Sequence, residues 1–162
     1  TLFAGIDKGR LKNRKEAIME KIEITPKNFN RIRHFLPPRV IELETLMGME
    51  ATCILINRYG GGAIPSTLNK TECGKASFAH YVELLGEKAA TRLKDGIFQY
   101  NRQESSYIIP RCNKALRYLR DEKIRADFDL LTESKSSVEA VNILTRDYGL
   151  WCRQVWYILK GY

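Results

Sequence analysis

The chain has few of the residues that build metal centres and disulfide frameworks. Its four cysteines and two histidines are widely scattered, without a CxxC pair: Cys53, Cys73, Cys112, Cys152, His34 and His80. Structural zinc sites and disulfide networks need such residues at close and regular spacing. We therefore expect no metal, no cofactor and reduced cysteines, as in a cytoplasm.

Long apolar runs and catalytic signatures are also missing. No apolar run approaches the ~18 residues that cross a membrane, and no signal peptide is visible at the start. The glycine run at 60–62 is not followed by GK[ST] and is not a GxGxxG, so it predicts no phosphate cradle. The acidic pairs Glu42 with Glu44 and Glu83 with Glu87 are typical of helix surfaces. The sequence predicts neither a membrane protein nor an enzyme.

Positive charge is present in excess, and it is unevenly distributed. The net charge is +8. Residues 8–39 hold ten Lys or Arg against three Glu, and residues 111–125 hold six basic against two acidic residues, so the remainder is slightly acidic. Basic patches attract the phosphates of DNA or RNA by releasing condensed counterions, without reading sequence. The alternative is a solvated basic surface.

The first half of the chain predicts two consecutive helices and a short extended segment. After Pro37-Pro38, helical spacing of apolar residues runs from Val40 to Met47 and ends at Gly48. A second helix is expected over about Met49–Tyr59, followed by an extended segment at Ala63–Pro65. Three residues of the second helix are expected to face inward: Ala51, Ile54 and Leu55.

The same pattern occurs twice. Leu46–Thr52 matches Leu84–Ala90 at an offset of 38 residues, and Ala63–Pro65 matches Ile108–Pro110 at an offset of 45. The second copy therefore has about seven extra residues, within 97–106. Such a repeat predicts duplicated units that pack together or dimerise. The alternative is a chance match between short helix–Gly–helix phrases.

Basic residues concentrate in two segments that flank the repeat. Residues 1–35 are predicted as a basic extension, with helices over Lys8–Lys21 and Asn28–Phe35. A longer helix is expected over about Cys112–Leu131, with an apolar face made by Leu116, Leu119, Ile124, Phe128 and Leu131. Four basic residues are expected to form a stripe largely on its other side: Arg111, Lys114, Arg117 and Arg125.

Residues 141–162 carry the clearest motif. They are predicted as two short helices separated by Tyr148-Gly149-Leu150, with apolar residues three or four apart in each. Gly149 suits the left-handed end of the first helix, and Val155 and Ile158 are expected to seat the second helix on the first. This is the skeleton of a helix-turn-helix, whose second helix meets the DNA major groove. The alternative is a helical hairpin unrelated to DNA. The residues left on or near the outer surface are Arg153, Gln154, Trp156, Tyr157 and Lys160.

These patterns together predict a mainly α fold in three regions. The first is the basic extension, residues 1–35. The second is a duplicated helical dimerisation region with short β-strand linkers, residues 36–110. The third is a helix-turn-helix DNA-binding domain, residues 111–162.

The order of these phrases resembles the Mor transcription activators of Mu-like bacteriophages and related mobile elements. The resemblance covers about Leu36 to Lys160. The order and spacing of the matching segments are more specific than any one segment alone. The matching phrases are Leu36-Pro37-Pro38, Leu46–Ala51, Tyr59-Gly60-Gly61, Ile64-Pro65, Gly86–Ala90, Tyr107–Pro110, Ile124–Asp127, Tyr148-Gly149-Leu150 and Arg153–Trp156.

The resemblance implies a homodimer in the cytoplasm of a bacterial host, associated with its nucleoid. Such a dimer binds double-stranded DNA beside a promoter and recruits or assists the host RNA polymerase. Carried over onto this chain, it implies base reading by Arg153 and Gln154, with Trp156 and Tyr157 beside them. Phosphate contacts are expected from Arg111, Lys114, Arg117 and Lys160. The linker between the two regions is expected at Gly60, Gly61, Tyr107 and Pro110.

The reading helix departs from the family pattern in ways that leave a second function open. Trp151 and Cys152 stand where a Ser or Thr cap would begin this helix, and Tyr157 stands where a basic residue is common. These aromatic residues suit stacking on sugars and thymine methyls, or contact with protein. The alternative function is therefore a protein-interaction module on the same fold that has lost base reading.

Overall fold

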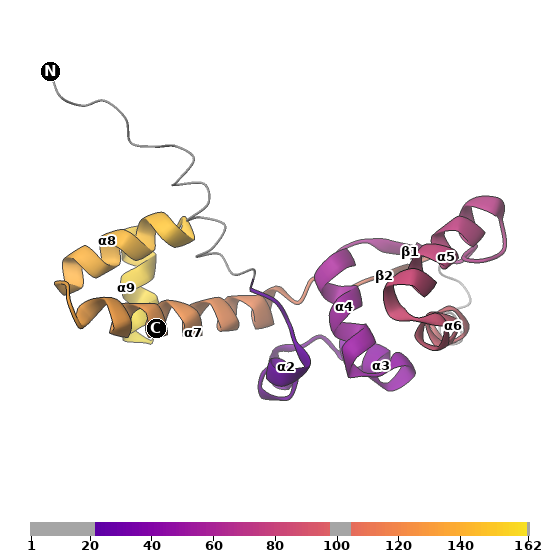
Figure 1. The fold of residues 1–162 in the computed structure, drawn as a ribbon, viewed down its shortest axis with the longest axis horizontal. Coiled ribbons are helices and arrows are strands. Elements are labelled where there is room, and N and C mark those ends of the chain that lie inside the picture. Colours follow the sequence, from indigo (N-terminus) through magenta and orange to yellow (C-terminus); the bar gives the residue numbers. More distant parts are fainter. Residues whose placement is uncertain (1–21, 98–104, 162) are drawn as a thin grey trace, which may run out of the picture. The chain divides into compact units, whose positions relative to one another are not determined.

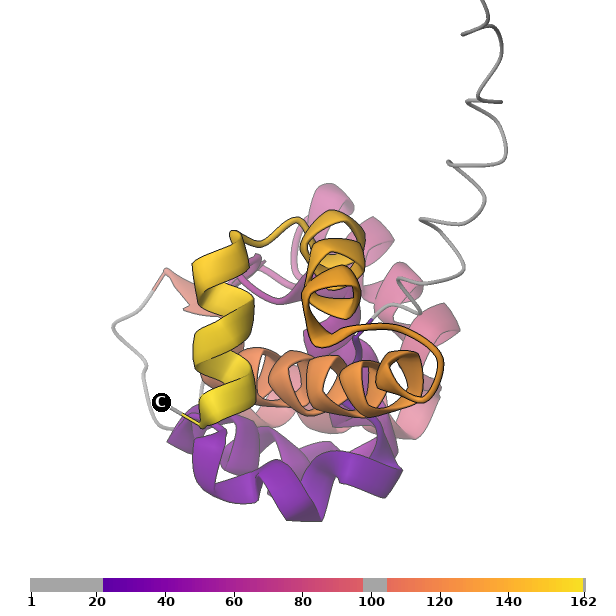
Figure 2. The ribbon, with the colours of Figure 1, turned by 90° about the vertical axis from the view of Figure 1, so that its left-hand side faces the viewer.

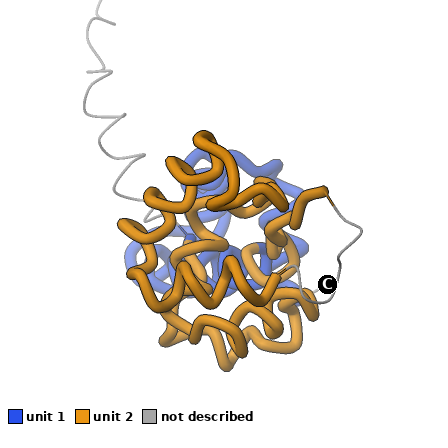
Figure 3. The backbone as a smooth tube through the Cα atoms, turned by 90° about the vertical axis from the view of Figure 1, so that its right-hand side faces the viewer, with its two compact units in different colours: residues 1–22, 117–162 blue, residues 23–116 orange. Residues whose placement is uncertain are grey.

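The computed structural model describes residues 22–97 and 105–161, which are mainly helical (Figure 1). They divide into two compact units, shown in Figure 3. We call residues 23–116 the repeat unit and residues 117–162 the C-terminal unit. The predicted helix over Lys8–Lys21 lies outside the described residues, as do most of the extra residues of the second copy. No described helix is both long and apolar enough to cross a membrane.

The repeat unit contains helices joined by short turns and a two-stranded antiparallel sheet. Proline begins α3 at its first position, and glycines end α3 and α4, so the predicted bounds of these two helices are confirmed to within two residues. In chain order the elements are α2 (Pro26–Ile32), η1 (Arg33–Phe35), α3 (Pro38–Met47), α4 (Met49–Tyr59), β1 (Ala63–Pro65), α5 (Glu72–Leu85), α6 (Glu87–Gly96) and β2 (Ser106–Ile108).

Part of the segment predicted as an extension is folded into this unit. Helix α2 packs against α4 and buries Phe29 and Ile32 completely. The Asn57 side chain on α4 fixes the residues just before α2. Its Nδ2 donates to the Ile24 carbonyl at 2.7 Å, and its Oδ1 accepts from the Ile24 N–H at 3.0 Å. Residues from 23 onward therefore belong to the folded repeat unit and are not a solvated arm.

The core of the repeat unit corrects one predicted position. Ala51 and Leu55 are buried as expected, but Ile54 is 42% exposed. At 100° per residue, the five buried residues of α4 cover an arc centred on Thr52, and Ile54 lies on the opposite side of the helix from that centre. Thr52 occupies this buried arc instead, and its hydroxyl donates to the Gly48 carbonyl at 2.8 Å. This bond removes the cost of burying a polar group there.

The C-terminal unit is built from three helices around one apolar cluster (Figure 2). These are α7 (Asn113–Thr132), which begins in the repeat unit, α8 (Ser137–Tyr148) and α9 (Cys152–Lys160). The predicted helix over Cys112–Leu131 is thus confirmed. The buried centre consists of Ile124, Val141, Leu144, Val155 and Ile158. Of these, Val155 and Ile158 seat α9 as expected.

Candidate nucleic-acid interface

The turn between α8 and α9 depends on Gly149. This residue has φ 64° and ψ 30°, the left-handed conformation predicted for it. It ends α8 and lets Leu150, which is partly buried, pack against the apolar cluster. The turn thereby brings α9 back onto α8, and the two helices pack together.

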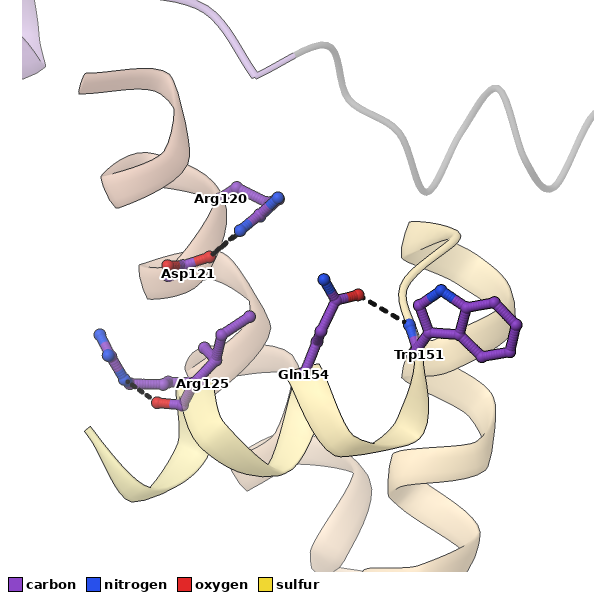
Figure 4. A network of polar contacts seen from close by, with 6 residues as sticks. Arg120, Asp121, Arg125, Trp151 and Gln154 are labelled. Carbon is purple, nitrogen blue, oxygen red and sulfur yellow. Dashed lines mark hydrogen bonds and ion pairs between the residues drawn. The ribbon is translucent and has the colours of Figure 1, made fainter. Parts of the chain in front are cut away.

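The first turn of α9 is held by a side chain that the sequence analysis assigned to base reading. Trp151 is the N-cap residue, and its side chain makes no capping hydrogen bond. Instead, Gln154 folds back, and its Oε1 accepts the Trp151 backbone N–H at 3.0 Å (Figure 4). This is the Gln half of a capping box. The signal was present in the sequence, because a Gln stands three residues after the N-cap.

Arg153 and Tyr157 form one stacked pair on the exposed side of α9. The Arg153 guanidinium lies 5.3 Å from the centre of the Tyr157 ring, and its Nε donates to the Tyr157 hydroxyl at 2.9 Å. Lys160 is one turn further along, and all three line a shallow hollow with Cys152 and Trp156. The structure thus brings together Arg153, Tyr157 and Lys160 as the sequence predicted.

Trp156 differs from its neighbours, because one side of it belongs to the core. It is half-buried and meets Phe128 edge to face, with ring centroids 6.4 Å apart. Trp151, in contrast, is 80% exposed. The three aromatic side chains therefore have different environments. Trp156 packs against Phe128, whereas Trp151 and Tyr157 are exposed to solvent.

Two polar contacts fix α8 and α9 to α7. Arg125 donates from Nε to the Ile158 carbonyl at 3.0 Å, near the end of α9 (Figure 4). Arg125 was predicted to lie in the open basic stripe, but its half-buried side chain binds a helix terminus because α9 packs there. On α8, the Tyr148 hydroxyl donates to Asp127. Burial and this hydrogen bond raise the pKa of Tyr148 above its ordinary value.

The predicted phosphate contacts are all exposed, three of them at the start of α7 and one on α9. Lys160 is exposed on α9 beside Arg153, and Arg117 is exposed on α7 in the same unit. Lys114 is exposed one turn before Arg117 on the same helix, and Arg111 is exposed just before that helix begins. Next to Arg117 on α7, Arg120 is paired with Asp121 at 2.7 Å (Figure 4), which reduces the positive charge there.

The predicted linker residues pack tightly within the repeat unit. A Cβ on Gly60 would lie 2.6 Å from the Ile56 carbonyl oxygen and 3.3 Å from that of Pro110. Gly61 has φ 88° and donates its N–H to Ile109 at 2.7 Å. Tyr107 is buried under the Arg39 guanidinium, 5.4 Å from its ring centre. The double glycine therefore allows the chain after α4 to lie directly against the segment that leads into α7.

Comparison with known proteins adds no relative to this geometry. No family model matches the chain, and no curated protein or solved structure is significantly similar to it. Among the described residues, no three His, Cys, Asp or Glu side chains are grouped to hold a metal ion.

Proposed function

We propose that the exposed face of α9 binds double-stranded DNA and that the chain is a sequence-specific transcriptional regulator of a phage or mobile element. One observation carries the proposal: α9 contains no carboxylate, so nothing on it repels phosphates. Its exposed side chains are basic, amide, thiol or aromatic, namely Cys152, Arg153, Gln154, Tyr157 and Lys160.

The residues of this face divide into base reading and phosphate binding. An arginine in the major groove contacts guanine with two nitrogens, and Arg153 is assigned this role. Its stacking on Tyr157 supports the assignment, because a side chain that is already oriented loses less entropy on binding. Lys160 and Arg117 are assigned to phosphates, which set the position of the helix but carry no sequence information.

From the resemblance we propose that the protein contacts the host RNA polymerase and activates transcription. The homodimer that the resemblance also implies is not proposed for this chain, because the two copies of its repeat already pack on each other within one chain.

A protein-interaction module is the second candidate, and Trp151 favours it. An 80% exposed tryptophan beside the exposed Tyr157 is typical of the anchors found in protein interfaces. The two candidates differ in salt dependence. DNA binding through several phosphates weakens steeply as salt rises, whereas an aromatic anchor depends little on ionic strength.

The experiment is a selection of bound duplexes from a random pool, followed by titration of the enriched sequence at several salt concentrations. Arg153→Ala is expected to weaken binding by about 1–3 kcal/mol at particular base pairs only. Lys75→Ala is the matched control, because it removes the same charge from an exposed residue on α5, in the repeat unit. Equal weakening for all sequences would make Arg153 a phosphate contact. No binding at low salt would support the protein-interaction module.

A further inference from the structure

The two copies of the repeat are joined in the same way. In each copy a helix ends and the next begins at one glycine, Gly48 or Gly86. Gly48 has φ 90° and ψ 162°, and Gly86 has φ 85° and ψ 153°. Each glycine donates its N–H to the carbonyl four residues earlier, at 2.8 Å and 2.9 Å. The first copy is therefore α3–α4–β1, and the second is α5–α6–β2.

Burial follows the same correspondence. At the offset of 38 residues, Leu55 on α4 matches Leu93 on α6, and both are 0% exposed. Thr52 and Ala90 match in the same way, and both are also 0% exposed. The sequence repeat therefore becomes a structural repeat, which makes a chance match of short phrases untenable.

The copies pack around an approximate two-fold axis. Helix α3 packs on α6 of the other copy, and α4 packs on α5, which is the same contact with the copies exchanged. The strands β1 and β2 are antiparallel, and Ala63 pairs with Ile108. These two residues are also equivalent at the offset of 45, so the pairing is unchanged when the copies are exchanged. This is the geometry of a symmetric dimer interface, here closed within one chain.

Only the second copy leads into the C-terminal unit. After β1 the chain passes through a short turn into α5, whose N-cap is Thr71. After β2 it passes through Pro110 into α7, α8 and α9. Among the described residues, the two copies of the repeat thus share a single helix α9. A dimer of two separate subunits would have one such helix for each copy.

From this asymmetry we infer that a single chain is the DNA-binding species and that its target is one asymmetric half-site rather than a palindrome. The inference rests on the proposed function. Two-fold dimers read palindromes because two recognition helices are related by the same axis as the two half-sites. Here the surfaces that would join two subunits are already buried, as Ile64 and Leu93 at 0% exposure show. A second chain could use those surfaces only by exchanging copies.

The test compares duplexes that hold one copy of the selected motif with duplexes that hold two inverted copies at varied spacing. The full chain is expected to bind both kinds of duplex with affinities that differ by only about a factor of two, because two independent motifs offer twice as many sites. Native mass spectrometry is expected to show one chain per motif. Linked binding by a dimer would raise the affinity by about 10²-fold or more at one spacing. That result, or an inverted repeat as the selected motif, would overturn the inference and leave the proposed function standing.

One control variant and two further outcomes complete the test. Arg153→Ala should relax the selected sequence at the base pairs that Arg153 contacts, while native mass spectrometry should still show a single free chain. A selection that enriches no motif would overturn the proposed function and, with it, the single half-site. A free chain that is dimeric and gains affinity on inverted motifs would identify an exchanged dimer and overturn the inference alone.

Discussion

Replacing Gly149 by alanine isolates the conformational requirement of the turn between α8 and α9. A Cβ at this position meets no atom of the described residues within 4 Å, so steric overlap does not contribute. What remains is the placement of an L-residue at φ 64°, which costs about 1–2 kcal/mol. Alanine also restricts the unfolded chain, which offsets part of this cost. We expect the C-terminal unit to lose about 1 kcal/mol of stability.

The two tryptophans make this loss measurable in the C-terminal unit alone. Trp151 and Trp156 are the only tryptophans of the chain, and both belong to this unit. Trp156 packs against Phe128, so its fluorescence should change when the three helices separate. For a small unit with a urea slope of about 1 kcal/mol/M, the midpoint should fall by about 1 M.

Two further variants test the reasoning. Gly149→Asn should lose less stability than Gly149→Ala, because Asn tolerates the left-handed region better. Gly161→Ala is the matched control: its φ is 77° and its Cβ position is also open, but no described helix depends on the direction of the chain there. An unchanged midpoint for Gly149→Ala, or an equal loss for Gly161→Ala, would refute the argument that this turn fixes α9 on α8.

Three other predictions concern the cores of the two units. Tyr148→Phe should cost about 1 kcal/mol near neutral pH, because Asp127 loses a donor. Since the pKa of Tyr148 is raised, the wild-type unit should also lose stability above about pH 10, where the unfolded phenol ionises, and Tyr148→Phe should lose less there in urea titrations. Leu55→Ala and Leu93→Ala should each cost the repeat unit about 2–5 kcal/mol, by circular dichroism, and a large difference between them would contradict equivalent environments. Iodoacetamide should label only the two exposed cysteines of the folded protein, since burial raises the pKa of each of the other two to about 11. The exposed pair is Cys73 and Cys152, and the buried pair is Cys53 and Cys112.

Local signals in the sequence were sufficient for the bounds of α3, α4 and α7. Pro38 has the fixed φ of a first helical position, and Gly48 and Gly149 supply positive φ values where a Cβ would be strained. Such requirements are properties of one residue and its neighbours, so they are visible without knowledge of the fold. The repeat was visible for the same reason, because its landmark is a glycine between two helices.

Contacts between helices were less accessible to sequence reasoning. Residues 53–56 of α4 are all apolar, so spacing alone could not show that Ile54 is the one turned outward. Arg125 was assigned to an exposed stripe because its binding partner, the Ile158 carbonyl, lies 33 residues away. Helix α5 was indicated only at Leu84-Leu85, since most of its face is exposed and its apolar spacing is weak. Each error concerns which side of a helix meets another element.

The hydrogen bond at the start of α9 limits how this helix can read bases if it binds DNA as proposed. A glutamine that reads adenine accepts a hydrogen bond with its oxygen and donates one from its nitrogen. In the free protein the oxygen of Gln154 already accepts the Trp151 N–H, and the side chain is folded back toward the helix start. Turning it outward would leave that N–H without its protein acceptor, at a cost of about 0.5–1.5 kcal/mol. Arg153 pays no such cost, because Tyr157 already holds its guanidinium on the exposed face. Discrimination between bases should therefore depend more on Arg153 than on Gln154.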